Sequence, residues 1–327
     1  MTNEIEPVAA TAPFDAEEFV TAASCYLLGG LSSPVRRRME LGNRPFYVAR
    51  GEGAYVWDEN DKRYLDLNCG HGSVLLGHSH PALREAMQRG IDMGMLCGQE
   101  TVLPARVAQR LTEMVPGAER VRFLLTGKDA TALAVRVARA HTGKLKVIKF
   151  EGHYHGVNEP LAFNNWPPPD QSGPRSSPSL RQENVGGIPE VRNYTSVLPW
   201  NDLELLEALL KREAAETAAV IMEPINYNSG CILPVPGYLE GVRELTRQHG
   251  VLLIFDEILS GFRTGPGCAQ GYFGVTPDLS TLGKALAGGV PLAALVGRQE
   301  VMETLAPIGD VMDQGTYYGH PLAMHAA

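Results

Sequence analysis

Two residues, Asp256 and Lys284, have types and a spacing that suit catalysis. Asp256 directly follows the apolar run 251–255, which is typical of a buried parallel strand whose carboxyl end carries an acid. Lys284 lies 28 residues further along the chain, among small residues and glycines that let a ligand approach it closely. An amine for an aldehyde and a carboxylate for a pyridine nitrogen are the two groups that pyridoxal phosphate (PLP) needs.

Each of the two residues also has an ordinary structural interpretation. A lone lysine is most often an exposed surface residue, and an aspartate after a strand often caps the next helix. The glycines around Lys284, together with Asp256 upstream, favour the catalytic interpretation of the pair. A buried lysine has a lowered pKa, which supplies the neutral amine that imine formation requires.

The segment Thr126-Gly127-Lys128-Asp129-Ala130 connects an expected strand to an expected helix. Backbone N–H groups and the helix dipole at such a junction favour a phosphate, to which Thr126 adds a hydroxyl and Lys128 a positive charge. A purely structural N-cap is an equally good explanation of the segment on its own.

Three further segments contain candidate cofactor contacts. Tyr154, in Gly-His-Tyr-His-Gly after the expected strand ending at Phe150, suits stacking on a flat ring. The amide of Asn228, which follows the expected strand 218–222, suits a phenolate oxygen, and Thr316 lies in a glycine-bounded loop before a helix. The two histidines beside Tyr154 lack acid or cysteine partners at metal-ligand spacing, so we expect no metal.

The elements that must position these residues alternate between helices and strands from about residue 80 onward. We expect strands at 121–125, 145–150, 218–222, 251–255, 279–282 and 292–296, with helices between them. This βαβ pattern predicts an α/β fold with a mostly parallel central sheet flanked by helices, with ligands at the carboxyl ends of the strands.

We expect three regions along the chain. Residues 1–18 form a mobile tail, and residues 19–79 form an N-terminal segment of helix and short strands. Residues 80–327 form a large domain that binds the cofactor, with a long loop at 162–196 that is rich in Pro, Ser, Asn and Gly. The sequence ends inside the start of a helix with no stop signal, so we expect a truncated chain.

Composition narrows the class of protein. The 327 residues are 44% hydrophobic and 20% charged, with a formal net charge of −8, which indicates a folded enzyme and argues against nucleic-acid binding. The five cysteines are scattered without a C-x-x-C spacing, as in reduced cytoplasmic proteins. There is no signal peptide pattern and no apolar stretch of membrane-spanning length, so we expect a cytoplasmic protein.

Several motifs together resemble the class III, fold-type I PLP aminotransferases, and in particular the branch of glutamate-1-semialdehyde 2,1-aminomutase. The resemblance runs from about residue 30 to the end. Its motifs are SPVR at 33–36, GHGSVLLGHSHP at 70–81, FEGHYHG at 150–156, DEILSGFR at 256–263, PDLSTLGKALAGG at 277–289 and GTYYGHP at 315–321.

The resemblance implies a role for each candidate residue. Lys284 is the Schiff-base lysine and Asp256 the partner of the pyridine nitrogen. The other implied contacts are Tyr154 on the ring, Thr126, Gly127 and Lys128 at the phosphate, Asn228 near O3′, Arg36 at the substrate carboxylate, and Thr316 at the phosphate of the neighbouring subunit in a homodimer. Arg36 is also compatible with a solvated basic cluster, since two more arginines follow it.

The chain departs from the family pattern in three places. The phosphate turn usually reads Ser-Gly-Thr-Glu-Ala, whereas here it is 126–130, Thr-Gly-Lys-Asp-Ala. The aminomutase has a tryptophan facing the substrate where this chain has His71, which favours an aminotransferase of different specificity. The C-terminal small domain of the family is missing from the sequence.

The function that we expect is therefore an aminotransferase that exchanges an amino group between an amino acid and a keto acid or aldehyde through Lys284, in ping-pong order. An intramolecular amino shift of the aminomutase type is the first alternative. A decarboxylase or racemase on the same fold, and a PLP-binding chain without catalysis, are weaker alternatives.

Overall fold

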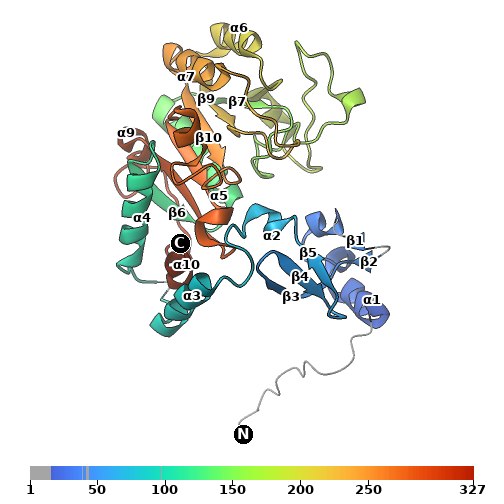
Figure 1. Ribbon diagram of the computed structural model, residues 1–327. Coiled ribbons are helices and arrows are strands. Elements are labelled where there is room, and N and C mark those ends of the chain that lie inside the picture. Colours follow the sequence, from blue (N-terminus) through green and yellow to red (C-terminus); the bar gives the residue numbers. More distant parts are fainter. Residues whose placement is uncertain (1–15, 39, 42–43, 97) are drawn as a thin grey trace. The chain divides into compact units, whose positions relative to one another are not determined.

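The computed structural model describes residues 16–38, 40–41, 44–96 and 98–327 (Figure 1). The expected N-terminal tail falls mostly outside these residues, as does Cys97. None of the helices in the described ranges combines the length and the hydrophobicity that are needed to span a bilayer.

The described residues divide into two compact units. One contains the residues up to Cys69 together with Leu76–His80, and the other contains Gly70–Leu75 and Pro81–Ala327. Each unit is described by itself below.

The first unit contains one longer helix and small antiparallel sheets. β1 pairs with β2, while β3, β4 and β5 form a three-stranded meander. Its elements are α1 Ala16–Tyr26, η1 Leu28–Gly30, η2 Pro34–Arg38, β1 Glu40–Leu41, β2 Arg44–Pro45, β3 Val48–Glu52, β4 Tyr55–Asp58 and β5 Arg63–Leu65. The buried Asp58 shapes the β4–β5 turn, because its Oδ1 accepts hydrogen bonds from the backbone N–H groups of Asn60 and Lys62.

The second unit contains a seven-stranded sheet with the strand order β6-β12-β11-β10-β9-β7-β8. All neighbours from β11 to β8 are parallel, and only β12 is antiparallel to the strands beside it. The strands are β6 Arg120–Leu124, β7 Lys146–Phe150, β8 Thr195–Leu198, β9 Thr217–Met222, β10 Leu252–Glu257, β11 Leu279–Leu282 and β12 Ala293–Gly297. The expected mostly parallel sheet is thereby confirmed.

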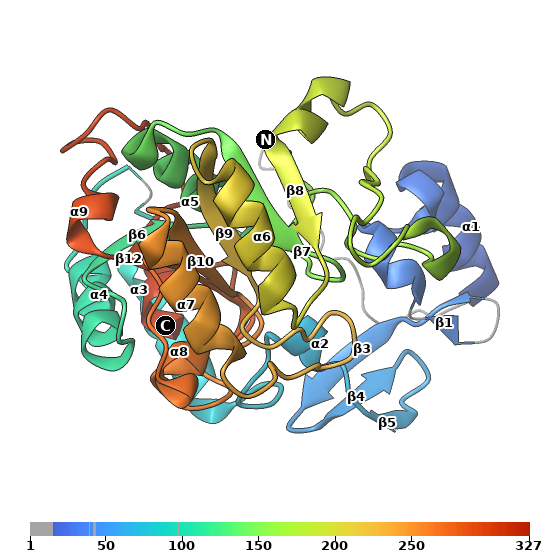
Figure 2. The ribbon, with the colours of Figure 1, turned by 90° about the horizontal axis from the view of Figure 1, so that it is seen from above.

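Helices cover both faces of this sheet, because alternate side chains of its central strands are apolar on each side. In β10, Leu252 and Ile254 join the core beneath α5, whereas Leu253 and Phe255 join the core beneath α6 and α7. Figure 2 shows α6 and α7 side by side over the sheet. The alternation places Asp256 on the α5 face and Glu257 on the opposite face.

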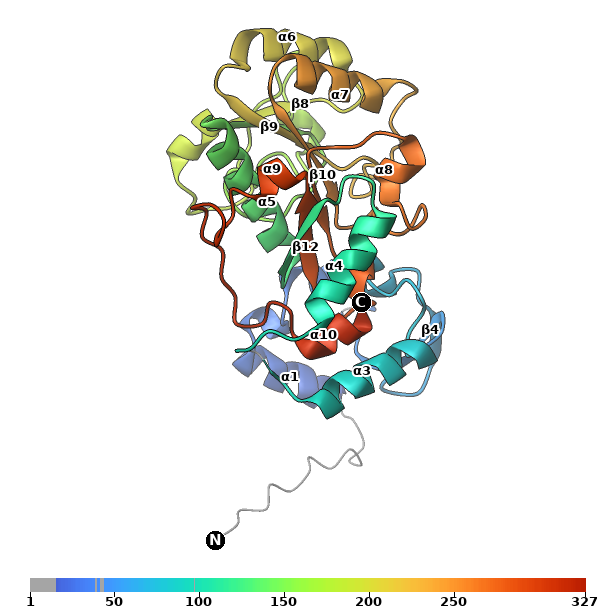
Figure 3. The same ribbon diagram turned by 90° about the vertical axis from the view of Figure 1, so that its left-hand side faces the viewer.

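The helices of the second unit fall into groups around the sheet. A third core lies on the face of the sheet opposite α5, between the strands β6 and β12 and the helices α4 and α10. Helix α3 packs against α10 (Figure 3). The helices are α2 Cys69–Gly72, which begins at the boundary of the two units, α3 Pro81–Met93, α4 Leu103–Met114, α5 Gly127–Thr142, α6 Leu203–Glu213, α7 Tyr238–Gln248, α8 Cys268–Phe273, α9 Gln299–Met302 and α10 Pro321–Ala326, with short 3-10 turns η3 Pro169–Gln171, η4 Pro189–Tyr194 and η5 Lys284–Ala287.

The segment 162–196, expected to be a long loop, contains more order than its composition indicates. It folds back on itself through a bridge between Phe163 and Gln182, and η4 leads directly into the edge strand β8. β8 was not predicted, because it has only four residues, two of them polar, and its pairing with β7 depends on residues distant in sequence.

Asp278 links several elements at the start of β11. Its side chain is buried and accepts hydrogen bonds from Leu253 N at 2.7 Å, Arg243 Nη1 at 2.8 Å and Arg298 Nη1 at 2.7 Å. We expect Asp278→Ala to lower the free energy of unfolding by about 3–5 kcal/mol, because it leaves buried donors and charges unpaired. Urea unfolding measures the change, and the exposed Asp92→Ala is the control, expected to change it by less than about 0.5 kcal/mol. Equal effects of the two substitutions would contradict this role.

Candidate active site

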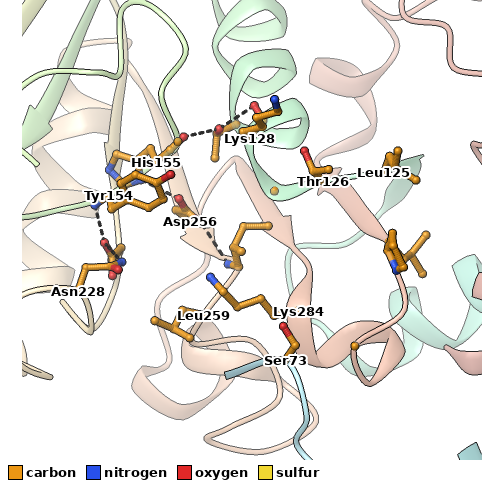
Figure 4. Close-up of a pocket in the computed structure, with 18 of the residues that line it drawn as sticks. Ser73, Leu125, Thr126, Lys128, Tyr154, His155, Asn228, Asp256, Leu259 and Lys284 are labelled. Carbon is orange, nitrogen blue, oxygen red and sulfur yellow. Dashed lines mark hydrogen bonds and ion pairs between the residues drawn. The ribbon is translucent and has the colours of Figure 1, made fainter. Parts of the chain in front are cut away.

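A cavity of about 400 Å³ lies in the second unit at the carboxyl edge of the sheet (Figure 4). Loops that follow β6, β7, β9, β10 and β11 contribute its walls, as expected for a parallel α/β sheet. The lining includes the candidates Thr126, Gly127, Lys128, Tyr154, Asn228, Asp256 and Lys284, together with His155 and Glu223.

Asp256 projects into the cavity from the end of β10 and is only 4% exposed. Its Oδ1 accepts hydrogen bonds from Thr281 Oγ1 at 3.1 Å and from Ile258 N at 3.0 Å. Its Oδ2 lies 2.7 Å from His155 Nδ1. The carboxylate is therefore fixed in orientation by three neighbours from three different segments.

Lys284 lies at the same cavity because β11 is the neighbour of β10. The register pairs Asp256 with Thr281, and Lys284 follows three residues later, at the start of η5. The lysine has a φ of 43°, in the left-handed region that a residue with a Cβ seldom adopts. Burial lowers the pKa of the Lys284 amine, while the nearby Asp256 and Glu223 charges oppose that shift.

The N-terminus of α5 forms another wall of the cavity. An α-helix leaves its first backbone N–H groups without intrahelical acceptors, so Gly127 and Lys128 offer donors at the cavity. A Cβ at Gly127 would lie 2.9 Å from the side chain of Ile258, which explains why a glycine is needed there. The Thr126 hydroxyl donates a hydrogen bond of 2.6 Å to Asp129.

Tyr154 carries the aromatic ring of the cavity. Its ring stacks on that of Trp166, with centroids 5.1 Å apart and planes inclined by 23°. Trp166 belongs to the segment 162–196, so that segment contributes directly to the position of Tyr154. No pattern in the sequence indicated this contact.

Glu223 is a buried member of the site that was not assigned a role from the sequence. Its Oε1 accepts hydrogen bonds from Tyr154 N at 2.8 Å and from Asn228 Nδ2 at 2.9 Å, and its Oε2 accepts one from Tyr227 N at 3.2 Å. Glu223 therefore ties the loop after β7 to the loop after β9. Burial raises the pKa of Glu223 to about 7, helped by the negative charge of Asp256.

His155 is the second unassigned member of the site. It is 1% exposed, its backbone carbonyl accepts a hydrogen bond of 2.7 Å from Thr131, and burial lowers the pKa of its imidazole. A signal for His155 was present in the sequence, since it directly follows Tyr154. Its partner Asp256 is 101 residues away, and that distance hid the contact.

Three predicted site residues do not line the cavity. Thr316 is exposed in the turn before α10, and His71 is exposed in α2, two residues before the cavity residue Ser73. Arg36 belongs to the first unit, where its guanidinium donates to Ser32 Oγ. Their roles stay predictions.

The residues of the cavity fit PLP. Its volume lies within the range of ordinary cofactor pockets, and it presents an amine, a fixed carboxylate, an aromatic ring and a helix N-terminus suited to a phosphate. Within the described residues, no group of three or more His, Cys, Asp or Glu side chains is arranged to hold a metal ion.

The raised pKa of Glu223 generates a prediction about stability and pH. A carboxyl group whose folded-state pKa is raised stabilises the fold fully below its unfolded pKa, and this contribution is lost as the pH rises through about 7. Glu223→Gln removes this titration. We therefore expect the difference in unfolding free energy, variant minus wild type, to increase by roughly 2–3 kcal/mol when the pH is raised from 5 to 8.

Urea unfolding of the ligand-free protein at both pH values measures this difference. The exposed Glu204→Gln is the control and is expected to follow the wild-type profile. Parallel profiles of wild type and Glu223→Gln would show that Glu223 does not titrate in this range.

Comparison with known proteins bears on this site directly. The class III aminotransferase family matches residues 38–327. The glutamate-1-semialdehyde 2,1-aminomutase of Syntrophobacter fumaroxidans is 42% identical over 305 residues, which cover 93% of this chain and 69% of that protein.

Two solved structures share the fold. An omega-transaminase from Sphaerobacter thermophilus is 33% identical with a TM-score of 0.89, and the match covers 98% of this chain and 72% of that one. A transaminase with PLP bound is 30% identical with a TM-score of 0.86, covering 97% of this chain and 73% of that one. The resemblance seen in the motifs is confirmed: the chain belongs to the class III aminotransferases, an enzyme family of the PLP-transferase fold, and its cofactor is pyridoxal phosphate.

Proposed function

We propose that this protein is an aminotransferase that moves an amino group between an amino acid and a keto acid or aldehyde. The proposed order is ping-pong, so the oxo product of the amino donor leaves before the acceptor binds. The observation that carries the proposal is that Lys284 and Asp256, 28 residues apart, line one cavity.

PLP supplies an aldehyde that bonds to amines and a pyridine ring that withdraws electrons from the carbon next to the bound nitrogen. We propose that Lys284 binds the aldehyde end and that Asp256 holds the ring nitrogen. Tyr154 stacks on the ring, and Asn228 donates to its phenolate oxygen. The helix N-terminus with Thr126, Gly127 and Lys128 holds the phosphate. The orientation of these groups within one cavity supports these roles.

Lys284 Nζ is also the proposed proton carrier. When a substrate amine takes its place, the freed amine of Lys284 would act as the base that takes the proton from the α carbon of the amino acid. The pKa lowered by burial supports this role, since a neutral amine is a base and an ammonium ion is not. Asp256, held by Thr281 and Ile258, keeps its carboxylate aimed while that proton moves.

We further propose that the protein is a cytoplasmic homodimer. In that dimer Thr316 contributes to the phosphate site of the neighbouring subunit, and Arg36 and His71 contact the substrate. Thr316 is exposed, as this role requires. The four described cysteines, Cys25, Cys69, Cys231 and Cys268, are free thiols, as is usual in a reducing compartment. The domain division proposed is 19–79 and 80–327.

An intramolecular amino shift is the alternative function. The 42% identity with a glutamate-1-semialdehyde 2,1-aminomutase favours it. His71 in place of the tryptophan of that branch favours transfer between two separate substrates.

Covalent attachment of the cofactor tests the assignment of Lys284 as the lysine that binds it. We expect borohydride treatment of the holoenzyme to attach a phosphopyridoxyl group to Lys284, because it is the partly buried lysine at the cavity, whereas Lys128 is exposed. Peptide mass spectrometry locates the group. Lys284→Ala should remove it, while Lys211→Ala, which changes an exposed lysine, should keep it. A phosphopyridoxyl group on another lysine of the wild type would overturn the assignment.

Release of oxo acid separates the two functions. We expect the holoenzyme, incubated with a panel of amino acids and no acceptor, to release about one oxo acid per active site in a single half-reaction, because ping-pong transfer stores the amino group on the enzyme. Chromatography of the products measures it. The matched assay with glutamate-1-semialdehyde must yield no 5-aminolevulinate. Formation of 5-aminolevulinate without release of any oxo acid would establish the aminomutase instead.

A further inference from the structure

Lys149 is an unusual residue of the second unit. It lies in β7 beside the site, is 0% exposed, and has no carboxylate within ion-pair distance among the described residues. Its partners are oxygen atoms of neutral groups. The three N–H groups of its ammonium are shared among four acceptors, which are His153 O at 3.0 Å, Leu161 O at 3.2 Å, Phe163 O and Asn165 Oδ1 at 2.7 Å.

These four oxygen atoms come from both ends of one segment, residues 151–165. His153 lies just after β7, whereas Leu161, Phe163 and Asn165 lie where the segment returns. Neutral oxygens gathered around one point repel each other, so they need a central cation to hold them together. The ammonium group of Lys149 therefore fastens the two ends of the segment to each other.

The fastened segment carries Tyr154 and His155. The backbone N–H of Tyr154 donates to Glu223, and the imidazole of His155 contacts Asp256. His153 adds a further link, because its Nδ1 accepts a hydrogen bond of 2.9 Å from Glu223 N. A change at Nζ of Lys149 is thus transmitted to the cofactor cavity through a segment that is held at both ends.

Packing alone does not explain a lysine at this position. Burial lowers the pKa of the Lys149 ammonium to about 7, although the negative charges of Glu183 and Glu223 oppose that shift, so a charge at this position is costly. A methionine has a similar volume and no charge, so it fills the space without this cost. The oxygen cage offsets the cost, and the cage is useful only if the segment must be held in one conformation.

We propose that the Lys149 ammonium serves as a built-in monovalent cation whose oxygen cage positions the segment 151–165, and with it Tyr154 and His155, for the cofactor. Lys149 does not line the cavity and is a positioning residue. The dependence on PLP in this proposal rests on the site proposed above, whereas the ordering of the segment does not.

Small cations test the proposal, because Lys149→Ala removes the ammonium group and leaves an unfilled space between the four oxygen atoms. In the ligand-free variant we expect hydrogen exchange in the segment 151–165 to be faster by about tenfold or more, with α6 and α7 unchanged. We expect the dissociation constant of PLP, measured by absorbance, to rise by about tenfold or more. Methylammonium should restore both, and tetramethylammonium, which is too large and has no N–H donors, should not.

Two matched variants complete the experiment. Lys149→Met keeps the volume without the charge and should behave as Lys149→Ala, without rescue. Lys146→Met changes the lysine that lies three residues earlier in the same strand and pairs with Glu213 and Glu216, so it should leave segment exchange and PLP affinity unchanged. If Lys149→Ala folds only when methylammonium is present during refolding, that result also supports the proposal.

Three results would contradict the proposal. Wild-type exchange and PLP affinity in both Lys149 variants would overturn the proposal. So would a loss of protection spread evenly over the chain and unaffected by methylammonium, or a failure to fold with and without it. Because segment exchange is measured without PLP, an error in the proposed reaction would leave this part of the test intact.

Discussion

The site depends on one constraint, the parallel pairing of β10 with β11. That pairing sets Asp256 beside Thr281 and places Lys284, three residues after Thr281, at the same edge. Thr281 then donates to the Asp256 carboxylate, so the strand that leads to the lysine also orients the acid. Crossover connections in α/β folds make neighbouring parallel strands end at one edge, which explains how an acid and an amine 28 residues apart come to line one cavity.

Around that edge the protein keeps several ionisable groups buried. Burial shifts the pKa of Lys284 downward and that of Glu223 up to about 7. Hydrogen bonds with backbone groups and neutral side chains hold Glu223 and Lys149, so that Glu223 links two loops and Lys149 links the two ends of another segment. Such interactions are strong in a low-dielectric interior and rigid in direction, which is what a site needs if it is to hold a cofactor in one orientation before substrate arrives.

The sequence predicted the sheet and placed Asp256 and Lys284 just after strands, because strand alternation and strand-end chemistry are local patterns. The apolar run before Asp256 and the glycines beside Lys284 carried enough information to predict a PLP site. The partners of these residues were not predictable, because each contact joins distant segments. His155 meets Asp256 across 101 residues, and Glu223 meets Tyr154 across 69. Lys149 was missed for a further reason: in a strand, a lysine normally indicates an exposed position.

The most direct test of the account concerns the bond between the acid and the ring. We would measure the ¹⁵N chemical shift of the pyridine nitrogen in wild type and in Asp256→Asn, each loaded with labelled PLP. The pH is chosen so that the pyridine nitrogen of free PLP is deprotonated. The account predicts a protonated nitrogen in wild type and a neutral one in the variant, with the cofactor still attached to Lys284 in both. The same shift in the two proteins would contradict it, because Asp256 would then not face the ring nitrogen.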